Sequence, residues 1–272
     1  MRRISRKNFI VIIIVAVLVA TTIFSLLIRE FSVLPQPSIF FLLDIVEPKS
    51  SDKVLIISPH QDDETLAVGG YIQRSVEVGA KVKIVLVTDG NRRKFGQDRD
   101  EEFFQATSKL GVKKDDLKFL DFPDGQLKNT PKDKLSNSIL SEMINFSPTI
   151  IFYPDKSDRH SDHHVIGEVV ESLISNSTNI YAYSYLVHFK YFPQPIGLHH
   201  GFYLLPPIKL IDFDHNWQKF SLSSDEENKK YEAISIYKSQ LRTPILCNLI
   251  LANVRKNELF SLKISPSSNS IK

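Results

Sequence analysis

The chain has 272 residues, of which 42% are hydrophobic and 24% are charged, and its formal net charge is +3. This is the composition of a globular protein with room for one large domain or two small ones. The small net charge gives no argument for a nucleic-acid partner. A single cysteine, Cys247, excludes an intramolecular disulfide framework and a cysteine-rich zinc site. Any metal ion must therefore be held by histidine and carboxylate side chains.

The N-terminus has the features of a membrane anchor. Residues 1–7 are basic, and residues 9–28 form an uncharged stretch, rich in Ile, Val and Leu, that is long enough to span a bilayer. A cleavable signal peptide would have a shorter apolar region followed by a small-residue cleavage site. A buried core helix is the other alternative, but the basic flank at the extreme N-terminus argues against it. We therefore expect a single-pass, uncleaved signal anchor at residues 8–28. The positive-inside rule then predicts a cytoplasmic tail at residues 1–7 and an extracytoplasmic location for everything after Arg29.

Beyond this anchor, strand-like and helix-like segments alternate. Residues 29–52 contain three prolines and are expected to form a linker. The alternation that follows predicts an α/β domain over residues 53–264, with a Rossmann-like, mostly parallel sheet and helices on both faces. A disordered tail is expected at residues 265–272. The expected strands are at 54–58, 82–88, 117–120, 149–153 and 181–188, and the expected helices at 64–78, 98–110, 132–145, 165–174 and 225–241.

A dense polar cluster follows the first expected strand. His60, Asp62, Asp63 and Glu64 place one imidazole and three carboxylates within five residues, at a strand-to-helix corner. Carboxylates this close repel one another unless something positive lies between them. A divalent metal ion would remove the repulsion, and a carboxylate beside the water it activates could act as a general base. The alternative is an acidic first turn that favours the helix dipole, with a surface histidine beside it.

A second cluster, which contains Asp158, His160, Asp162 and His163, follows the expected strand at 149–153. In parallel sheets the ligand site lies beyond the carboxyl ends of the strands, so both clusters should meet at one edge. The two histidines are three residues apart and can face one pocket, with the two aspartates available to fix a histidine tautomer. A solvated loop with a capping aspartate is the alternative. Two imidazoles and one carboxylate suit Zn²⁺ with an open position, although Fe²⁺ or Co²⁺ would also fit. These residues predict metal-assisted hydrolysis of a carbonyl compound.

Together the two clusters resemble the motifs of the PIG-L/LmbE-like N-deacetylases, a family of zinc enzymes. The family patterns P-H-P-D-D-E and H-P-D-H stand here as Pro59-His60-Gln61-Asp62-Asp63-Glu64 and His160-Ser161-Asp162-His163. Gln61 and Ser161 replace prolines of the pattern, which affects the loops and not the chemically active positions. The resemblance covers roughly residues 53–260. Weaker matches are Arg99-x-x-Glu102-x-x-x-Ala106-x-x-x-Leu110-Gly111-Val112, Phe122-Pro123-Asp124-Gly125 and Ala233-x-x-x-Tyr237-x-Ser239-Gln240.

The resemblance implies roles for individual residues. It implies that the zinc ligands are His60, Asp63 and His163. Asp62 is implied as the general base that deprotonates the attacking water. His160 would stabilise the tetrahedral oxyanion or protonate the leaving amine, with Asp162 orienting it.

Substrate contacts are implied at Arg99 and Asp124, and His188 could enter the active site or be structural. The family reaction is removal of acetate from an N-acetylglucosamine unit carried on a larger molecule. We therefore expect a membrane-anchored, zinc-dependent de-N-acetylase whose substrate is an extracytoplasmic glycan or a lipid-linked sugar. The alternatives are a zinc amidohydrolase acting on another acylated small molecule and a metal-dependent sugar-binding module. The last needs no general base, so Asp62 and His160 argue against it.

Overall fold

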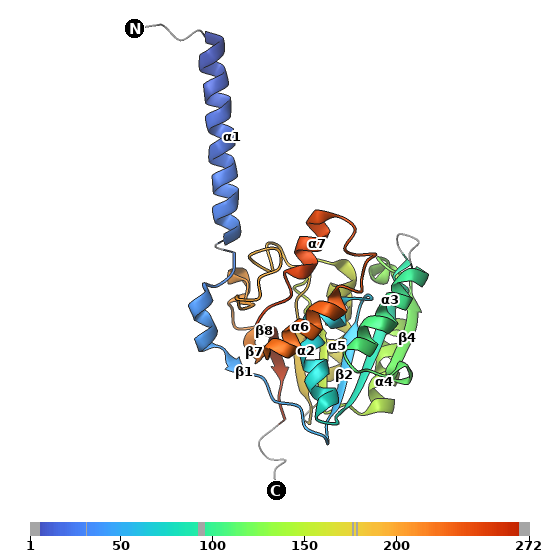
Figure 1. Ribbon diagram of the computed structural model, residues 1–272. Coiled ribbons are helices and arrows are strands. Elements are labelled where there is room, and N and C mark those ends of the chain that lie inside the picture. Colours follow the sequence, from blue (N-terminus) through green and yellow to red (C-terminus); the bar gives the residue numbers. More distant parts are fainter. Residues whose placement is uncertain (1–5, 31, 92–95, 176, 178, 267–272) are drawn as a thin grey trace.

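The computed structural model describes residues 6–30, 32–91, 96–175, 177 and 179–266 (Figure 1). Helix α1 (Arg6–Glu30) projects from the rest of the molecule (Figure 1). Its segment Lys7–Ser25 has a mean hydropathy of 2.6, and none of it is buried. The helix is a candidate membrane span by length and composition, criteria that a signal sequence near the N-terminus would also meet.

A single eight-stranded sheet, in the order β1-β7-β8-β6-β5-β2-β3-β4, forms the centre of the domain. Strand β8 pairs antiparallel with β6 and β7, and the other neighbouring strands pair parallel. The expected mostly parallel α/β sheet is therefore confirmed. The strands are β1 (Leu43–Asp44), β2 (Lys53–Ser58), β3 (Lys81–Thr88), β4 (Leu117–Phe122), β5 (Ile150–Pro154), β6 (Tyr181–Tyr185), β7 (Asn216–Ser221) and β8 (Asn257–Ile264).

Helices cover both faces of this sheet. Val54 and Ile56 of β2 enter one apolar core, which includes residues of α2, α3 and α6, whereas Leu55 and Ile57 enter a second core with residues of α4 and α5. Successive side chains of a strand point to opposite faces. A central strand buried on both sides therefore reads as an uninterrupted apolar run. The helices are α2 (Asp63–Glu77), α3 (Gly96–Lys109), α4 (Lys132–Phe146), α5 (Ser161–Ile174), α6 (Ser224–Ile234) and α7 (Pro244–Leu251), with short 3₁₀ turns at Gln36–Phe41, Lys114–Asp116, Leu127–Asn129 and Ile208–Leu210.

The strand order reverses between β2 and β5. These two strands are neighbours in parallel register, with Ile56 opposite Phe152, and the chain continues from β2 through β3 to β4 on one side and from β5 to β6 on the other. Connections that leave a parallel sheet in opposite directions open a crevice at the carboxyl ends of the two central strands. The segments that follow β2 and β5 therefore converge there.

The domain begins earlier than expected, because part of the 29–52 segment belongs to it. Strand β1 pairs with β7 at the edge of the sheet, and Ile39 and Ile45 are buried. The interpretation of residues 29–52 as a linker is wrong for these positions, since a short edge strand among prolines carries no periodic pattern to reveal it. Of the expected terminal tails, residues 1–5 and 267–272 lie outside the described part of the chain.

Strand β6 ends at Tyr185, three residues before the expected boundary. The backbone N–H groups of Val187 and His188 both donate to Asp158 Oδ2, at 3.0 and 2.9 Å. These bonds turn the chain away from the sheet, because amides that bind a side chain cannot also bind a neighbouring strand. Helix α6 likewise ends at Ile234, before the expected 241.

Candidate active site

The loop between β2 and α2 folds the first cluster over the end of the sheet. Asp62 has a φ of 147°, which is unusual for a non-glycine residue and costs about 1–3 kcal/mol. Its N–H lies 3.3 Å from Glu64 Oε2, and its carbonyl accepts from Leu66 N at 2.9 Å. Glu64 is fully buried and also accepts from Ser58 Oγ (3.2 Å) and Tyr237 Oη (2.6 Å). These bonds hold the strained turn in place, and they give Glu64 a structural role.

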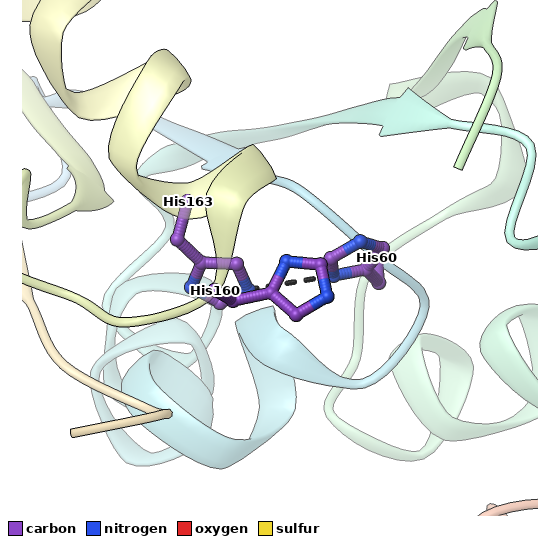
Figure 2. Close-up of side chains that lie close together, drawn as sticks. All are labelled: His60, His160 and His163. Carbon is purple, nitrogen blue, oxygen red and sulfur yellow. Dashed lines mark hydrogen bonds between the residues drawn. The ribbon is translucent and has the colours of Figure 1, made fainter. Parts of the chain in front are cut away.

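Three donor atoms converge at the crevice, and we call their residues, His60, Asp63 and His163, the metal-donor cluster. His60 Nδ1 and His163 Nε2 lie 3.1 and 3.0 Å from Asp63 Oδ2, and 3.4 Å from each other. Tetrahedral coordination at zinc bond lengths places ligand atoms about 3.3–3.6 Å apart. The three atoms are close to that spacing, so the residues fit a divalent metal ion. Figure 2 shows the His60 and His163 rings approaching each other with His160 alongside.

Two further histidines lie near enough to offer alternative donor sets. Atoms of His60, His160 and His163 lie within 4.8 Å of one another, and so do atoms of Asp63, His163 and His188. The metal-donor cluster is more compact than the 4.8 Å limit that describes these two alternative sets, since the distances between its three donor atoms do not exceed 3.4 Å.

The far nitrogens of both donor histidines face carboxylates. His163 Nδ1 lies 3.3 Å from Asp158 Oδ2, and His60 Nε2 lies 3.3 Å from both Asp162 Oδ2 and Asp124 Oδ1. Carboxylates in these positions keep a proton on the far nitrogen and leave the near nitrogen free to bind a metal. Asp158 and Asp162 thus lie beside the donor histidines, and their role in fixing the tautomers stays a prediction.

Asp162 does not orient His160 through its carboxylate, as the resemblance implied. That carboxylate accepts from Gly125 N at 2.7 Å and Leu127 N at 3.2 Å, in addition to its contact with His60. It is the backbone N–H of Asp162 that donates to His160 Nδ1, at 3.3 Å. The loop at 125–127 approaches the carboxylate only in the folded chain, which is why the motif alone misassigns the partner.

The metal-donor cluster requires a positive charge. Burial lowers the pKa of His163, but the charges of Asp63 and Asp158 outweigh burial and raise this pKa to about 9. For His60, burial is likewise outweighed by hydrogen bonds to carboxylates, chiefly Asp124, which raise its pKa well above its usual value. Burial raises the pKa of Asp63, yet the neighbouring charge of His163 holds it well below its usual range. Without a metal ion, protons supply the positive charge that a divalent cation would otherwise provide.

Asp62 has the ionisation behaviour of a general base. Burial and the charge of Asp63 raise the pKa of Asp62 to about 7, although the positive charge of Arg99 opposes the shift. Arg99 Nη2 lies 3.6 Å from Asp62 Oδ1. A carboxylate with a pKa near neutrality can accept a proton and later return it.

His160 caps the amino end of α5 and is neutral near pH 7. Burial and the positive charges of His60 and His163 lower the pKa of His160 to about 4. Because His160 Nδ1 accepts the N–H of Asp162, the proton of the neutral ring must be on Nε2. The Nε2–H of this neutral ring can therefore donate a hydrogen bond.

Arg99 and Asp124, the implied sugar contacts, are mostly buried and lie next to Asp62 and His60. Arg99 donates to the carbonyl oxygens of Gln61 (3.2 Å) and Gly90 (3.3 Å), and its Nη1 lies 3.6 Å from Asp124 Oδ2. Their side chains are only 11% and 7% exposed. Arg99 lies close to Asp62 and Asp124 lies close to His60, and contact of either residue with a sugar stays a prediction.

Gln61, which stands where the family pattern has proline, fixes the loop in another way. It is fully buried, and its Nε2 donates to Asp100 Oδ1 of α3 at 2.7 Å. Gly90, with φ +58°, lies so close that a Cβ there would be 2.0 Å from Gln61 Oε1. The close packing replaces the stiffness of a proline ring.

A cavity of about 450 Å³ opens beside the metal-donor cluster. Asp62 lines it, and so does His188, which is 47% exposed and whose Nε2 lies 3.8 Å from Asp63 Oδ1. The position of His188 fits the expectation that it enters the active site. A larger hollow of about 890 Å³ between α3 and α6 has none of these residues in its lining. The apolar side of the active-site cavity, which we call the cavity wall, consists of Leu66, Val187, Phe189, Phe192, Pro193, Leu246, Leu249 and Ile250.

Sequence reasoning did not find the cavity wall. Most of it comes from the segment after β6 and from α7, two parts of the chain without a chemical motif. The one available signal was the concentration of aromatic residues around Phe192 and Pro193, which packing alone could also explain.

Comparison with known proteins agrees with this geometry. Residues 55–174 match the family model for PIG-L, described as GlcNAc-PI de-N-acetylase. A probable N-acetyl-alpha-D-glucosaminyl L-malate deacetylase 2 from Bacillus cereus is 31% identical over 136 residues, which are 45% of this chain and 60% of the relative. The diacetylchitobiose deacetylase of Thermococcus kodakarensis is 32% identical over 127 residues, which are 42% of this chain and 46% of the relative. The chain thus spans about half of the length of the curated relatives it matches.

The fold also matches solved structures. The N,N'-diacetylchitobiose deacetylase of Pyrococcus horikoshii, solved with an inhibitor, superposes with a TM-score of 0.57 at 20% identity, covering 92% of this chain and 97% of that one. The matched residues 55–174 contain both halves of the metal-donor cluster. Residues 55–174 therefore match the PIG-L family, as the two motifs predicted.

Proposed function

We propose that the protein is a metal-dependent deacetylase that hydrolyses the N-acetyl group of a glucosamine-type sugar. The observation that carries this proposal is the convergence of three donor atoms within 3.4 Å of one another, with Asp62, the residue before the donor Asp63, in the lining of the adjoining cavity. PIG-L proteins are metal-dependent de-N-acetylases, and the relatives named above are deacetylases of N-acetylated sugars. A binding module would have no use for a buried carboxylate at this position.

The metal-donor cluster is the proposed metal site. Two imidazoles and one carboxylate favour zinc, and Fe²⁺ is the other candidate. A bound metal ion would polarise the amide carbonyl and lower the pKa of a water molecule toward about 7.

Asp62 is proposed to take the proton from the attacking water. Asp62 lines the active-site cavity. Because its pKa is about 7, both its ionised and its protonated forms are present near neutral pH. Once protonated, Asp62 can give the proton to the nitrogen of the leaving amine. Water and the amide thus yield acetate and a free amino sugar, with no other reactant needed.

His160 is proposed to stabilise the oxyanion. Its Nε2–H can donate a hydrogen bond to the carbonyl oxygen as negative charge develops there. Of the two roles implied by resemblance, protonation of the amine fits less well, because the low pKa of His160 leaves no proton to give at neutral pH. His188, at the cavity, is proposed to contact the sugar.

The anchor determines where this reaction would occur. Helix α1 has the length and apolar composition to span a bilayer, and residues 2–7 are basic. We propose a cytoplasmic N-terminus with the PIG-L domain outside, acting on a cell-surface or lipid-linked sugar. Protease added outside intact cells should then digest the domain, and a domain cleaved only after lysis would refute this orientation.

Acetate release from the full-length protein in detergent tests the activity. The panel should contain N-acetylglucosamine on different acceptors, including diacetylchitobiose and a lipid carrier, together with N-acetylated compounds that are not sugars. We expect hydrolysis of glucosaminides, its loss after chelation and its return with Zn²⁺ or Fe²⁺. Hydrolysis of the other amides alone would indicate an amidohydrolase, and metal-dependent sugar binding without acetate would indicate a binding module. Either result would refute the proposal.

A further inference from the structure

Exposed apolar side chains gather in three segments, one of which, α7, also lines the active-site cavity. Among the described residues outside α1, thirteen large apolar side chains are exposed, and eleven of them lie in residues 36–44, residues 196–213 or α7. Apolar side chains scattered singly over a surface are ordinary, whereas a concentration of them marks a contact surface. The eleven are Phe40, Phe41, Leu43, Ile196, Leu198, Phe202, Ile208, Ile211, Phe213, Ile245 and Leu249. We call the subset Phe40, Leu198, Phe202, Ile208, Ile245 and Leu249 the apolar rim.

Hydrogen bonds fasten the three segments to one another. Gly197 N donates to Asn248 O of α7 at 2.8 Å, and Tyr203 N donates to Gln36 Oε1 at 2.7 Å. Phe40 and Phe202 line the same small hollow. Because α7 also supplies part of the cavity wall, the apolar rim continues to the mouth of the active site.

The segments that carry or adjoin the apolar rim are hydrogen-bonded to the residues that follow α1. Ser32 Oγ donates to Tyr191 O at 2.8 Å, and Ser32 O accepts from Ile208 N at 3.0 Å. Figure 1 shows α7 at the end of the domain from which α1 projects.

The length of α1 determines how far Ser32 lies from the apolar layer of a membrane that α1 would span. The uncharged apolar stretch ends at Ile28 and the helix at Glu30, a difference of two residues or about 3 Å. The polar layer of a bilayer is about 5–7 Å thick on each side. If α1 spans the bilayer, Ser32 lies where the headgroups meet water. The hydrogen bonds of Ser32 therefore keep the apolar rim at the membrane surface.

The charge around the apolar rim also fits a lipid surface. Residues 186–211 and 235–256 contain no Asp or Glu. The acidic residues of the three exposed segments are Asp44 and Asp212. A surface with few acidic groups, carrying both basic and apolar side chains, is attracted to anionic headgroups and can insert its apolar groups below them. The exposed basic residues of these segments are Lys190, Lys209, Lys238, Arg242 and Lys256.

We propose that the apolar rim rests on the bilayer that α1 enters, so that the active-site cavity opens against the membrane surface. The inference rests on the proposed membrane anchor. In this arrangement the enzyme would act on sugars held at the membrane and would act less well on sugars dissolved in water.

The depth of two isoleucines in the membrane tests this proposal. Ile245 of α7 is 75% exposed, and Ile144 of α4 is 65% exposed. Ile144 lies toward the amino ends of the strands, opposite the carboxyl ends that carry the active site, because Phe146 O of the same helix accepts from Lys53 Nζ at the start of β2. Full-length protein with Cys247→Ser and either Ile245→Cys or Ile144→Cys would be labelled with a fluorophore. Each sample would be reconstituted into phosphatidylcholine vesicles with phosphatidylglycerol and with bromine-bearing lipids as quenchers.

We expect the lipid bromines to quench the label at position 245 and to leave the label at position 144 unchanged. Absence of quenching at both positions, or equal quenching, would overturn the proposal. A change at position 245 that follows protein concentration and not lipid would also overturn it, by indicating a contact between copies of the chain. This measurement needs no activity, so it stands even if the proposed deacetylation fails.

An activity comparison gives the functional side of the test. For Ile245→Asp we expect several-fold slower acetate release from a lipid-linked glucosaminide, with the rate on a short soluble glucosaminide unchanged. Ile144→Asp should match the parent protein on both substrates. Equal losses on both substrates with Ile245→Asp would count against a membrane role for the apolar rim. An inactive parent protein would refute the proposed function and leave the quenching result in force.

Discussion

The metal-donor cluster and the cavity wall meet at one active site but are built by different means. The cluster comes from the ends of β2 and β5, is nearly inaccessible to solvent, and has carboxylates on both donor imidazoles. The cavity wall comes from the segment after β6 and from α7, and it presents apolar and partly exposed side chains. The proposed chemistry therefore depends on groups that follow the central strands, whereas the proposed choice of substrate would depend on a surface made by a loop segment and α7.

Removing a donor should have the largest effect. We expect His163→Ala to lose its metal ion and its activity, because two donors cannot hold the ion as three do. Elemental analysis and acetate release would measure both. The matched control is His164→Ala, since His164 is adjacent, exposed and outside the cluster. A full metal complement in His163→Ala would exclude His163 as a ligand.

Changing the base should separate chemistry from metal binding. Asp62→Asn keeps the size of the side chain, so the metal should remain while kcat falls by about 10²–10⁴. Elemental analysis shows whether the ion is retained, and single-turnover acetate release gives the chemical rate. Activity at the parent level would contradict the assignment of Asp62 as base.

The partners of the donor histidines should matter less than the donors. Asp158→Asn removes the charge that faces His163 Nδ1, and we expect about 10–100-fold weaker metal affinity. Competition with a chelator measures this affinity, and saturating metal should restore most of the activity. If affinity were unchanged, the contact would have no influence on the metal.

Metal binding should depend on pH in a defined direction. With a pKa of about 9, His163 is protonated at pH 7 in the metal-free protein, so the ion must displace this proton. Apparent affinity should therefore rise as pH increases toward 9, by about tenfold per unit for each proton released. Calorimetry in buffers with different ionisation enthalpies counts the protons. Affinity independent of pH between 6 and 8 would show that the donor imidazoles are already neutral.

A change in the cavity wall should have the smallest effect. Leu249 is partly exposed, and Leu249→Ser removes an apolar contact that contributes about 1 kcal/mol, which raises KM by about threefold to tenfold. The value of kcat and the metal content should stay as in the parent. A loss of metal in this variant would show that the cavity wall helps to hold the metal-donor cluster in place and that the two regions are not independent.

The sequence predicts the cluster better than the wall for physical reasons. Buried parallel strands read as continuous apolar runs, so β2 and β3 begin within one residue of their expected starts. The parallel pairing of β2 with β5, which also begins within one residue of its expected start, then brings His60 and His163 together. The roles of these residues in catalysis stay predictions that the variants above test.

Other contacts arise only from tertiary structure. Strand β1 has two residues and no periodicity, and β7 was not expected at all. The approach of Asp162 to His60 depends on the loop at 125–127, which lies far from both in the sequence. Residues in the wall carry no chemical signature, because apolar side chains near a pocket look like ordinary packing.

The strained turn at Asp62 has a consequence for how this sequence can change. A glycine there would adopt the same backbone without strain, and the chain would fold more readily while losing its proposed proton acceptor. Selection for stability and selection for turnover thus favour different residues at one position. An aspartate in this conformation is kept only as long as its carboxylate is needed. Replacement of Asp62 in a related sequence would therefore be an early sign that the protein has lost its enzymatic activity.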